Sequence, residues 1–317
     1  MRRTVLVTGA NRGIGLAFAS QLLARGDHVI ATCRHPGKAA ALNALGGAHP
    51  GRLHVLPLDV ASEKSRAELI RELPLVLGED GRLDLLINNA GVLHSGERFG
   101  QLRQETLEDS LRINAIGPLL LAQAVAPLLR DGNRAAGGNE GVTGTGATGA
   151  VINQANHVER LDHGSGGARA ADTTSSGLDL RSGIAGSGGG REAIKSLPDT
   201  RLVDRLPAAA AASGCPVIAN LSSQLGSITG VTRFGTPGYA ISKAAQNMAG
   251  AQLAQALAPR GIVVLALHPG WAQTDMGGPR ATDAPAEVVA GMLRLIDAAT
   301  PAQSGGFFDW QGKTLPW

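Results

Sequence analysis

The sequence predicts an α/β protein built on a doubly wound parallel sheet with helices on both faces. Three observations indicate this fold class: short β-branched runs alternate with longer segments of helical spacing, the strand-like runs are apolar on both sides, and unusual polar residues and glycines collect where those runs stop. Such alternation is typical of parallel sheets covered by helices. Ligands of these sheets bind beyond the carboxyl ends of the strands, so we expect the chemistry there.

Six apolar runs are predicted as strands buried on both faces. They lie at residues 4–10, 28–34, 53–60, 83–91, 216–223 and 262–270. Between the first two, residues 15–26 (GLAFASQLLARG) have the spacing of a helix.

The composition favours a globular protein without a nucleic-acid surface or a membrane span. A net charge of +3 and 3% aromatic residues provide neither a basic stripe nor stacking side chains for nucleic acid. No run approaches the roughly 18 apolar residues of a spanning helix, and the apolar start after Met1 is too short for a signal peptide. Cys33 and Cys215 lack metal-ligand or redox spacing, so we expect a reduced, cytoplasmic protein with no metal site.

A glycine-rich turn joins the first predicted strand to the first helix. TGANRGIG places Gly9, Gly13 and Gly15 where tight turns let a cofactor's phosphates approach the free N–H groups and the positive end of the helix dipole. The spacing Gly-x-x-x-Gly-x-Gly differs from the commoner Gly-x-Gly-x-x-Gly dinucleotide pattern.

Tyr239, the sole tyrosine of the chain, stands four residues before Lys243 in TPGYAISKAAQ. On a helix the two side chains share a face. Taken alone, the pair also fits a half-buried aromatic beside a solvated lysine. An acid/base tyrosine working near pH 7 needs its pKa lowered by about three units, roughly 4 kcal/mol. A cation about 5 Å away supplies roughly 3 kcal/mol at an effective dielectric near 20, so Lys243 would supply most of that shift.

Seven motifs occur in the order found in short-chain dehydrogenases/reductases, which the chain therefore resembles. They are TGANRGIG, the 59–60 strand end, NNAG at 88–91, LRINAIGP, SS at 222–223, YAISK and PGWAQT. LSSQLGSITG, HPGWAQTDMGGP and FFDWQGKTLPW are similar to the carbonyl-reductase and C-factor-like branch. The resemblance covers about 1–130 and 215–317. It implies a Rossmann-type sheet, a nicotinamide cofactor and a single catalytic domain formed by these two parts.

The resemblance implies a catalytic tetrad of Asn114, Ser223, Tyr239 and Lys243. Tyr239 would exchange the proton with the substrate oxygen, Ser223 would hydrogen-bond that oxygen, and Lys243 would bind the nicotinamide ribose. Asn114 would hold a water that links Lys243 to solvent. Ser222 is the second candidate for the serine, although the family pattern favours Ser223.

Charge favours NADP(H) over NAD(H) as the cofactor. Where an NAD enzyme places an acid after the second strand, this chain has Arg34, and Arg12 lies in the glycine turn. Two arginines would bind a 2′-phosphate through charge-assisted contacts; the alternative is that one or both are solvated. The full set expected to bind the cofactor is Gly9, Asn11, Arg12, Gly13, Ile14, Gly15, Arg34, Asp59, Val60, Asn88, Ala90, Gly91, Tyr239, Lys243, Pro269, Gly270 and Thr274.

We expect a small carbonyl compound or alcohol as substrate and a homodimer or homotetramer as the assembly. The substrate walls would come from His94, from Gln224 to Phe234 and from the segment after Thr274. The alternative function is a C-factor-like signalling protein that binds the nucleotide with little turnover.

Residues 131–214 form a long Gly/Ser-rich insertion where the family has a short link. The composition predicts a disordered or loosely structured segment, with His157 and His163 solvated rather than metal-bound. The insertion precedes a strand of a parallel sheet, so it should emerge at the edge opposite the nicotinamide.

Overall fold

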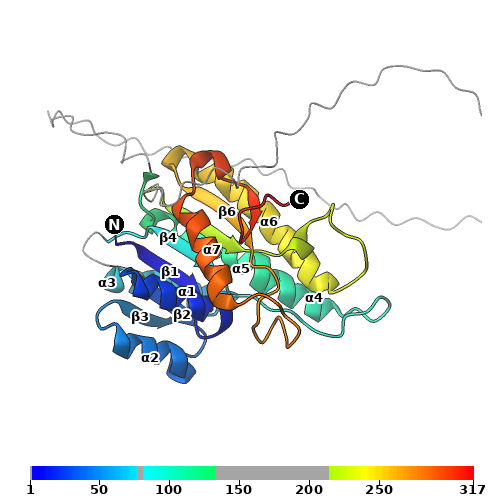
Figure 1. Cartoon of the computed structure of the whole chain (residues 1–317), viewed down its shortest axis with the longest axis horizontal. Coiled ribbons are helices and arrows are strands. Elements are labelled where there is room, and N and C mark those ends of the chain that lie inside the picture. The colour runs from blue at the N-terminus through cyan, green and yellow to red at the C-terminus, as the bar shows by residue number, and fades with distance from the viewer. Residues whose placement is uncertain (1, 78–80, 133–213) are drawn as a thin grey trace, which may run out of the picture. The chain divides into compact units, whose positions relative to one another are not determined.

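The computed structural model describes residues 2–77, 81–132 and 214–317. In these ranges one seven-stranded sheet has the order β3-β2-β1-β4-β5-β6-β7, and every neighbouring pair is parallel (Figure 1). The strands are β1 (Thr4–Thr8), β2 (His28–Cys33), β3 (Leu53–Pro57), β4 (Leu85–Asn88), β5 (Val217–Leu221), β6 (Val263–His268) and β7 (Phe307–Asp309).

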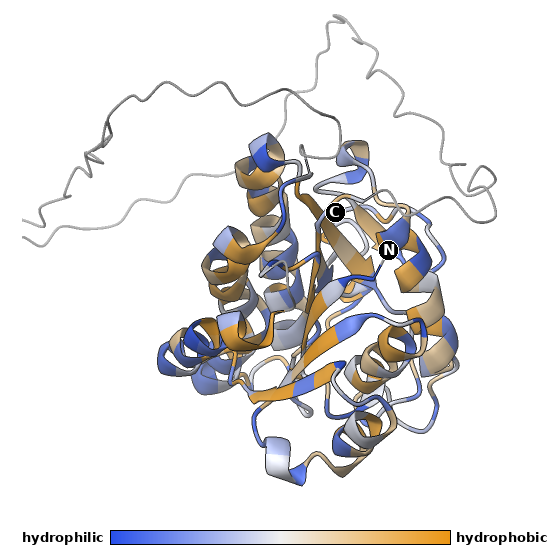
Figure 2. Ribbon diagram, turned by 90° about the vertical axis from the view of Figure 1, so that its left-hand side faces the viewer, coloured by the Kyte–Doolittle hydropathy of each residue, from blue (hydrophilic) through white to orange (hydrophobic). Residues whose placement is uncertain are grey.

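Helices cover both faces of this sheet. The α-helices are α1 (Gly13–Ala24), α2 (Ala40–Ala48), α3 (Glu63–Val76), α4 (Gln104–Leu111), α5 (Gly117–Val125), α6 (Pro237–Leu257) and α7 (Pro285–Asp297), and a π-helical turn, Arg112–Ile116, joins α4 to α5. One apolar core lies between the sheet and α1, α2 and α7, and the other between the sheet and α3, α5 and α6. Figure 2 shows the apolar strands enclosed between the two helical layers.

The alternation of side chains along each strand divides the strand between the two cores. On β1, Val5 and Val7 belong to the core beneath α1 and α7, whereas Leu6 belongs to the core beneath α3 and α5. All three are fully buried. A strand covered on both faces reads as a continuous apolar run, and this confirms the predicted doubly wound α/β fold class.

The sequence prediction of the strands was wrong in two respects. Every predicted strand is shorter in the structure, because the residues counted at its carboxyl end, such as Gly9, Arg34 and Asp59, lie beyond the sheet. The seventh strand, β7, was not predicted at all. Its three residues are too few to show a periodicity, and it exists because Phe307 pairs with Ala266 at the sheet edge.

The helical run Gln104–Leu128 is long and apolar enough to cross a membrane by length and composition alone. In the fold it packs against the sheet through Leu121 and Val125, both fully buried, as a core helix does.

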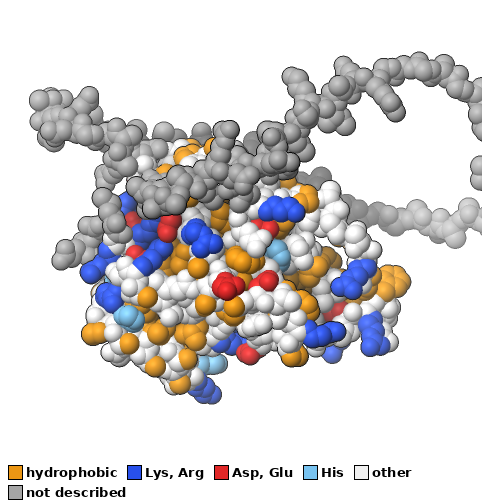
Figure 3. All heavy atoms as spheres, in the orientation of Figure 1, with side chains coloured by type: hydrophobic (Ala, Val, Ile, Leu, Met, Phe, Trp, Pro, Cys, Tyr) orange, Lys and Arg blue, Asp and Glu red, His pale blue; other side chains and the backbone are white. Residues whose placement is uncertain are grey.

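On the face shown in Figure 3, lysine and arginine side chains are scattered among apolar and acidic ones.

The described residues on either side of the insertion meet at the amino ends of the strands. A Cβ added to Gly132 would lie 2.3 Å from the carbonyl oxygen of Gly261 and 3.2 Å from Cδ of Pro216. Gly261 stands just before β6 and Pro216 just before β5. The described flanks of the insertion, Gly132 and Pro216, therefore lie together at the amino ends of the strands. Residues 133–213 themselves, including His157 and His163, lie outside the described residues.

Candidate active site

The glycine turn between β1 and α1 is hydrogen-bonded to the turn after β4. The hydroxyl oxygen of Thr8 accepts the N–H groups of Asn89 and Ala90, each at 3.0 Å. The side-chain amide of Asn89 donates to the carbonyls of Thr8 and Gly9 at 2.8 and 3.1 Å. Sequence reasoning placed residues 88–91, and so Asn89, at the adenosine ribose of the cofactor and assigned no role to Thr8. The two turns thus form one rigid rim at the carboxyl edge of the sheet.

Gly15 allows the first turn of α1 to pack closely against the glycine turn. A Cβ on Gly15 would lie 2.3 Å from the carbonyl oxygen of Gly9, whose φ of +64° also favours glycine. Arg12, at the N-cap of α1, makes no side-chain cap hydrogen bond in the described structure, and the first turn of the helix carries no acid. The helix N-terminus therefore keeps its positive end for an external anion. Of the other predicted contacts, Asn11 is exposed and Ile14 is half-buried.

The two arginines predicted to bind a 2′-phosphate lie in different surroundings. Arg34 follows β2 directly and is exposed. Arg12 is also exposed but forms an ion pair with Asp275, 2.7 Å between nitrogen and oxygen. Lys38 is a further exposed cation four residues beyond Arg34, which sequence reasoning missed; its signal was a second basic residue soon after the strand.

Two of the predicted cofactor contacts at the strand ends, Asp59 and Asn88, have side chains that bind protein partners. The Asp59 carboxylate accepts the N–H of Ala61 at 3.0 Å, so it shapes the turn after β3 beside the buried Val60. The side chain of Asn88 is buried and donates to Oδ1 of Asn220 at 2.9 Å, which joins β4 to β5.

The loop after β6 closes against the glycine turn. Pro269 and Gly270, with φ of +71°, begin this loop, and Thr274 lies over Gly13: a Cβ on that glycine would be 3.2 Å from Cγ2 of Thr274. Together with the Arg12–Asp275 pair, this contact brings the loop of β6 next to the start of α1, as expected of residues that share one cofactor.

Lys243 is held inside the protein by uncharged acceptors. Its ammonium donates to the carbonyl of Leu221 at 2.6 Å and to Oε1 of Gln246 at 2.9 Å, and it lies 5.6 Å from the centroid of the Tyr239 ring. Burial lowers the pKa of Lys243 to about 7. Gly91 lies next to both Asn114 and Lys243, because a Cβ there would be 3.1 Å from Oδ1 of Asn114 and 3.8 Å from the lysine Nζ.

The Tyr239 phenol lies against Ser223 at the end of β5. Burial raises the pKa of Tyr239 to about 12, and the hydrogen bond with Ser223 opposes part of that rise. The expected lowering of this pKa by Lys243 is therefore wrong for the structure described here. Burial disfavours the phenolate, and Lys243 is itself half neutral near pH 7, so the cation that the prediction relied on is only partly available.

Ser222 and Ser223, which follow β5, have different partners. Ser223 bonds Tyr239 and also accepts the N–H of Leu225 at 3.2 Å. The hydroxyl of Ser222 donates to Oδ1 of Asn247 at 2.5 Å, inside the packing of α6. The geometry therefore favours Ser223 as the serine that a substrate oxygen can reach.

Asn114 is fully buried in the π-helical turn between α4 and α5. Its amide nitrogen donates to the carbonyl of Val92 at 2.8 Å and to the hydroxyl of Ser242 at 2.9 Å. Its amide oxygen accepts the N–H of Val92 at 2.8 Å. Both donors are used and one lone pair of the oxygen is left, which is the position a bound water would take. Sequence reasoning placed Asn114 on a regular helix; π-helical turns occur often at functional sites.

The loops predicted as substrate walls carry exposed apolar side chains. His94 faces α4 instead, where its Nε2 lies 3.0 Å from the Asp109 carboxylate. The exposed apolar residues of the loops at this edge are Leu93, Phe99, Leu225, Ile228, Val231, Phe234, Trp271 and Met276. These loops therefore present exposed apolar side chains at the carboxyl ends of the strands.

Comparison with known proteins agrees with this geometry and confirms the resemblance to short-chain dehydrogenases/reductases. A family model described as short chain dehydrogenase matches residues 3–139 and 207–285. The carbonyl reductase Sniffer of D. melanogaster superposes with a TM-score of 0.72 at 27% identity, and both chains are covered completely. An NADPH-bound carbonyl reductase from chicken fatty liver gives a TM-score of 0.70 at 28% identity, again with complete coverage.

Two curated relatives differ in how much of their length is matched. C-signal of Myxococcus xanthus is 49% identical over 100 residues, which is 32% of this chain and 60% of C-signal. A dehydrogenase of Rhodococcus, named for 1-hydroxy-2-glutathionyl-2-methyl-3-butene, is 28% identical over 99% of both chains.

Proposed function

The chain belongs to the short-chain dehydrogenase/reductase family, and from this premise we propose that it is an NADP(H)-dependent oxidoreductase that reduces an aldehyde, ketone or quinone, or oxidises the corresponding alcohol. The observation that carries the proposal is the position of the Tyr239 phenol beside Ser223 and the buried Lys243, whose Nζ lies 5.6 Å from the centroid of the tyrosine ring. These groups lie at the carboxyl end of β5, where ligands of such sheets bind.

In carbonyl reduction Tyr239 donates its proton to the substrate oxygen. With its pKa raised to about 12, the phenol is fully protonated at neutral pH, which is the form that a general acid requires. Ser223 donates a second hydrogen bond to the same oxygen and stabilises its developing negative charge. When the Ser223 hydroxyl turns from the phenol, the substrate oxygen replaces the Tyr239 oxygen as its hydrogen-bond acceptor.

Lys243 adjusts how easily Tyr239 releases that proton. Because burial brings its pKa to about 7, a modest gain of interactions with its ammonium is enough to keep it charged near neutral pH. The charged lysine, 5.6 Å from the ring centroid, then favours the phenolate that is left after proton transfer. Asn114 would hold a water on its remaining lone pair, and protons from solvent would return to Lys243 and Tyr239 through that water.

The nicotinamide cofactor supplies or accepts the hydride, and the glycine turn fits its phosphates. The close approach of Gly15 to Gly9 leaves backbone N–H groups at the start of α1 for the pyrophosphate. Thr274 would border the carboxamide, and Lys243 would bind the ribose. The preference for the phosphorylated cofactor is supported by exposed Arg34 and Lys38 after β2 and by the NADPH bound to the chicken carbonyl reductase.

A second candidate is a signalling role in which nucleotide binding matters more than turnover. The similarity to C-signal over 100 residues favours it. The two functions differ in what they require of the tetrad, because a binding protein tolerates loss of the phenol whereas an oxidoreductase does not.

The experiment that tests the proposal is cofactor oxidation with a panel of aldehydes, ketones and quinones, measured with NADPH and with NADH. We expect turnover that depends on NADPH and is largest for apolar carbonyls. Tight NADPH binding without turnover of any member of the panel would favour the signalling role instead.

A further inference from the structure

The helix that carries Tyr239 begins without a cap of its own. Thr236, the N-cap of α6, is the one non-glycine residue with positive φ (44°) in the described parts of the chain, and its side chain makes no cap hydrogen bond. Pro237 follows at the first helical position and has no N–H. By helix geometry the N–H groups of Gly238 and Tyr239 are then the ones that need partners from outside the helix.

Glu97 provides the missing cap from a distant loop. Its Oε2 accepts the N–H of Gly238 at 3.1 Å across 141 residues of sequence. Its Oε1 is buried and has no hydrogen-bond partner within the described ranges. A carboxylate at a helix N-terminus gains from the positive end of the dipole, so the contact is attractive in charge as well as in hydrogen bonding.

Gly238 is shaped to receive this carboxylate. A Cβ at position 238 would lie 2.4 Å from Oε1 of Glu97 and 3.2 Å from the hydroxyl oxygen of Ser110. Ser110 is fully buried in α4 and its hydroxyl donates to the carbonyl of Thr106, so that wall is fixed. The glycine directly before the catalytic tyrosine is therefore the residue that lets Glu97 approach.

A second contact joins the same two loops. The rings of Phe99 and Phe234 meet edge to face, with 5.7 Å between centroids, although their residues are 84% and 53% exposed. Figure 1 shows the loops after β4 and after β5, teal and yellow-green, extending on the same side of the molecule. Glu97 and Phe99 belong to the first loop, and Phe234 and Gly238 to the second loop and its helix.

We propose that Glu97 is a positioning residue for Tyr239: by capping α6 it fixes the first turn of the catalytic helix to the loop that walls the substrate. This inference rests on the role proposed above for Tyr239. Glu97 itself need not touch the substrate. Movement of the β4 loop is passed to the phenol through one hydrogen bond to the residue beside it.

The test uses the fact that Tyr239 is the only tyrosine in the chain. Protein labelled with carbon-13 at the tyrosine Cζ gives a single resonance, which reports the surroundings of the phenol without any need for activity. Four variants are compared with the parent: Glu97→Ala, Glu97→Gln, Gly238→Ala and the double variant Glu97→Ala/Gly238→Ala. Glu105→Ala is the matched control, because its side chain is 80% exposed and pairs with Arg103 instead of α6.

Glu97→Ala is expected to shift and broaden the tyrosine resonance and to lower kcat by about tenfold or more, because small displacements of a catalytic group are costly. Glu97→Gln keeps an acceptor for the N–H of Gly238. It should therefore return the tyrosine resonance to its position in the parent and restore kcat to within about threefold of the parent value. Gly238→Ala should resemble Glu97→Ala, and the double variant should be no worse than either single one, as expected for two changes that break the same contact. Glu105→Ala should match the parent.

Two results would overturn the inference. One is an unchanged tyrosine resonance in folded Glu97→Ala, and the other is losses that add in the double variant. If the parent oxidises no NADPH, the proposed function fails, but the resonance still decides whether Glu97 positions Tyr239.

Discussion

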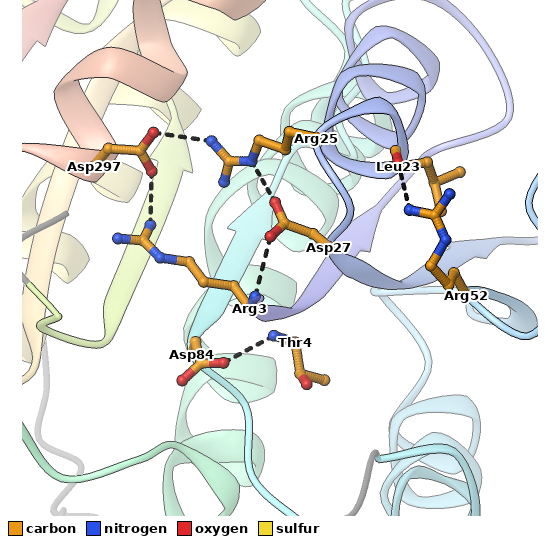
Figure 4. A network of polar contacts seen from close by, with 8 residues as sticks. All are labelled: Arg3, Thr4, Leu23, Arg25, Asp27, Arg52, Asp84 and Asp297. Atoms are coloured by element: carbon orange, nitrogen blue, oxygen red, sulfur yellow. Dashed lines mark hydrogen bonds and ion pairs between the residues drawn. The ribbon is translucent and has the colours of Figure 1, made fainter. Parts of the chain in front are cut away.

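Charged side chains are arranged differently at the two ends of the parallel strands. The amino edge is the side at which the strands begin, and the carboxyl edge is the side at which they end. At the amino edge, Arg3 and Arg25 both bind the carboxylate of Asp297, each at 2.9 Å, and Asp27 accepts from the backbone N–H of Arg3 at 3.0 Å and from the side chain of Arg25 (Figure 4). Asp84 accepts the N–H of Thr4 at 2.8 Å beside them. Opposite charges are paired throughout this network.

At the carboxyl edge, Lys243 is only 4% exposed and its acceptors are uncharged. Tyr239 is half-buried, and the one interaction that favours its phenolate is that with Ser223. Both groups are therefore shifted toward their neutral forms. The amino edge uses charge to hold the strands together, whereas the carboxyl edge leaves two groups that can change protonation when a charged cofactor binds. The predictions below test this division.

The largest expected effect is that of Tyr239→Phe, which keeps the ring and removes the proton donor. We expect kcat to fall by about 10²–10⁴-fold, the usual contribution of a general acid. The affinity for NADPH and the free energy of unfolding should change little. Steady-state kinetics with the best carbonyl of the panel provide the measurement, and a fully active Phe variant would remove the tyrosine from the mechanism.

Lys243→Met tests how much folding stability is lost by burying a lysine whose hydrogen-bond acceptors are uncharged. Folding lowers the pKa of Lys243 from 10.5 to about 7, so between these pH values the unfolded chain binds a proton that the folded chain does not. Stability from this group therefore rises with pH. The unfolding free energy of the parent relative to Lys243→Met should rise from pH 7 upward by at most about 1.4 kcal/mol per pH unit. Urea titrations at several pH values measure the slope; a difference that stays constant with pH would contradict the burial argument.

Arg34→Asp tests the cofactor preference at the same edge. Replacing an attraction by a repulsion should weaken NADPH binding by about 10–100-fold and NADH binding far less. Arg12→Ala should have the smaller effect, because Asp275 already neutralises part of its charge. Titration of each variant with both cofactors measures this, and equal losses for NADPH and NADH would assign Arg34 to the general fold.

At the amino edge, Asp297→Ala should lower stability without lowering activity. The side chain is one-third exposed and holds two arginines, so we expect a loss of about 1–2 kcal/mol. The matched control is Glu68→Ala, whose pairing with Lys64 is long, at 3.9 Å, and solvated, and which should cost less than about 0.5 kcal/mol. Urea unfolding and kcat/KM are measured together. A large loss of kcat/KM in folded Asp297→Ala would show that the two edges are coupled.

The smallest effect is expected for replacing residues 133–213 by a short Gly/Ser link. The flanks Gly132 and Pro216 already lie together at the amino edge, so a short link can join them. The shortened chain should fold and bind NADPH, with kcat/KM within a few-fold of the parent. Loss of activity in a folded deletion variant would mean that the insertion reaches the carboxyl edge or is required for an active oligomer.

The sequence was sufficient for what depends on local patterns. Apolar runs predicted six of the strands, and glycine spacing predicted the turn after β1. Contacts between distant residues had no such signal: Glu97 meets Gly238 across 141 positions. Asn114, in the π-helical turn, likewise bonds Val92 and Ser242, which lie 22 and 128 positions away in the sequence.

The pKa of Tyr239 shows the same limit in chemical terms. Sequence spacing correctly placed a lysine near the phenol, at 5.6 Å from its ring. It did not predict how deeply the two groups are buried, and burial determines the direction of both pKa shifts. The proximity of Tyr239 and Lys243 was thus predictable, while the directions of their pKa shifts in the folded chain required the structure.

The central claim, that Tyr239 is a proton donor whose pKa responds to the cofactor, is tested most directly by its own ionisation. Because the chain has one tyrosine, tyrosinate absorbance reports on this residue alone. In the protein without cofactor the phenol should remain protonated at a pH near 10, where a free tyrosine is half ionised, since its pKa is about 12. With saturating NADP⁺ the account predicts ionisation at distinctly lower pH, as the positive nicotinamide and a charged Lys243 favour the phenolate. An unchanged titration with NADP⁺ bound would contradict it.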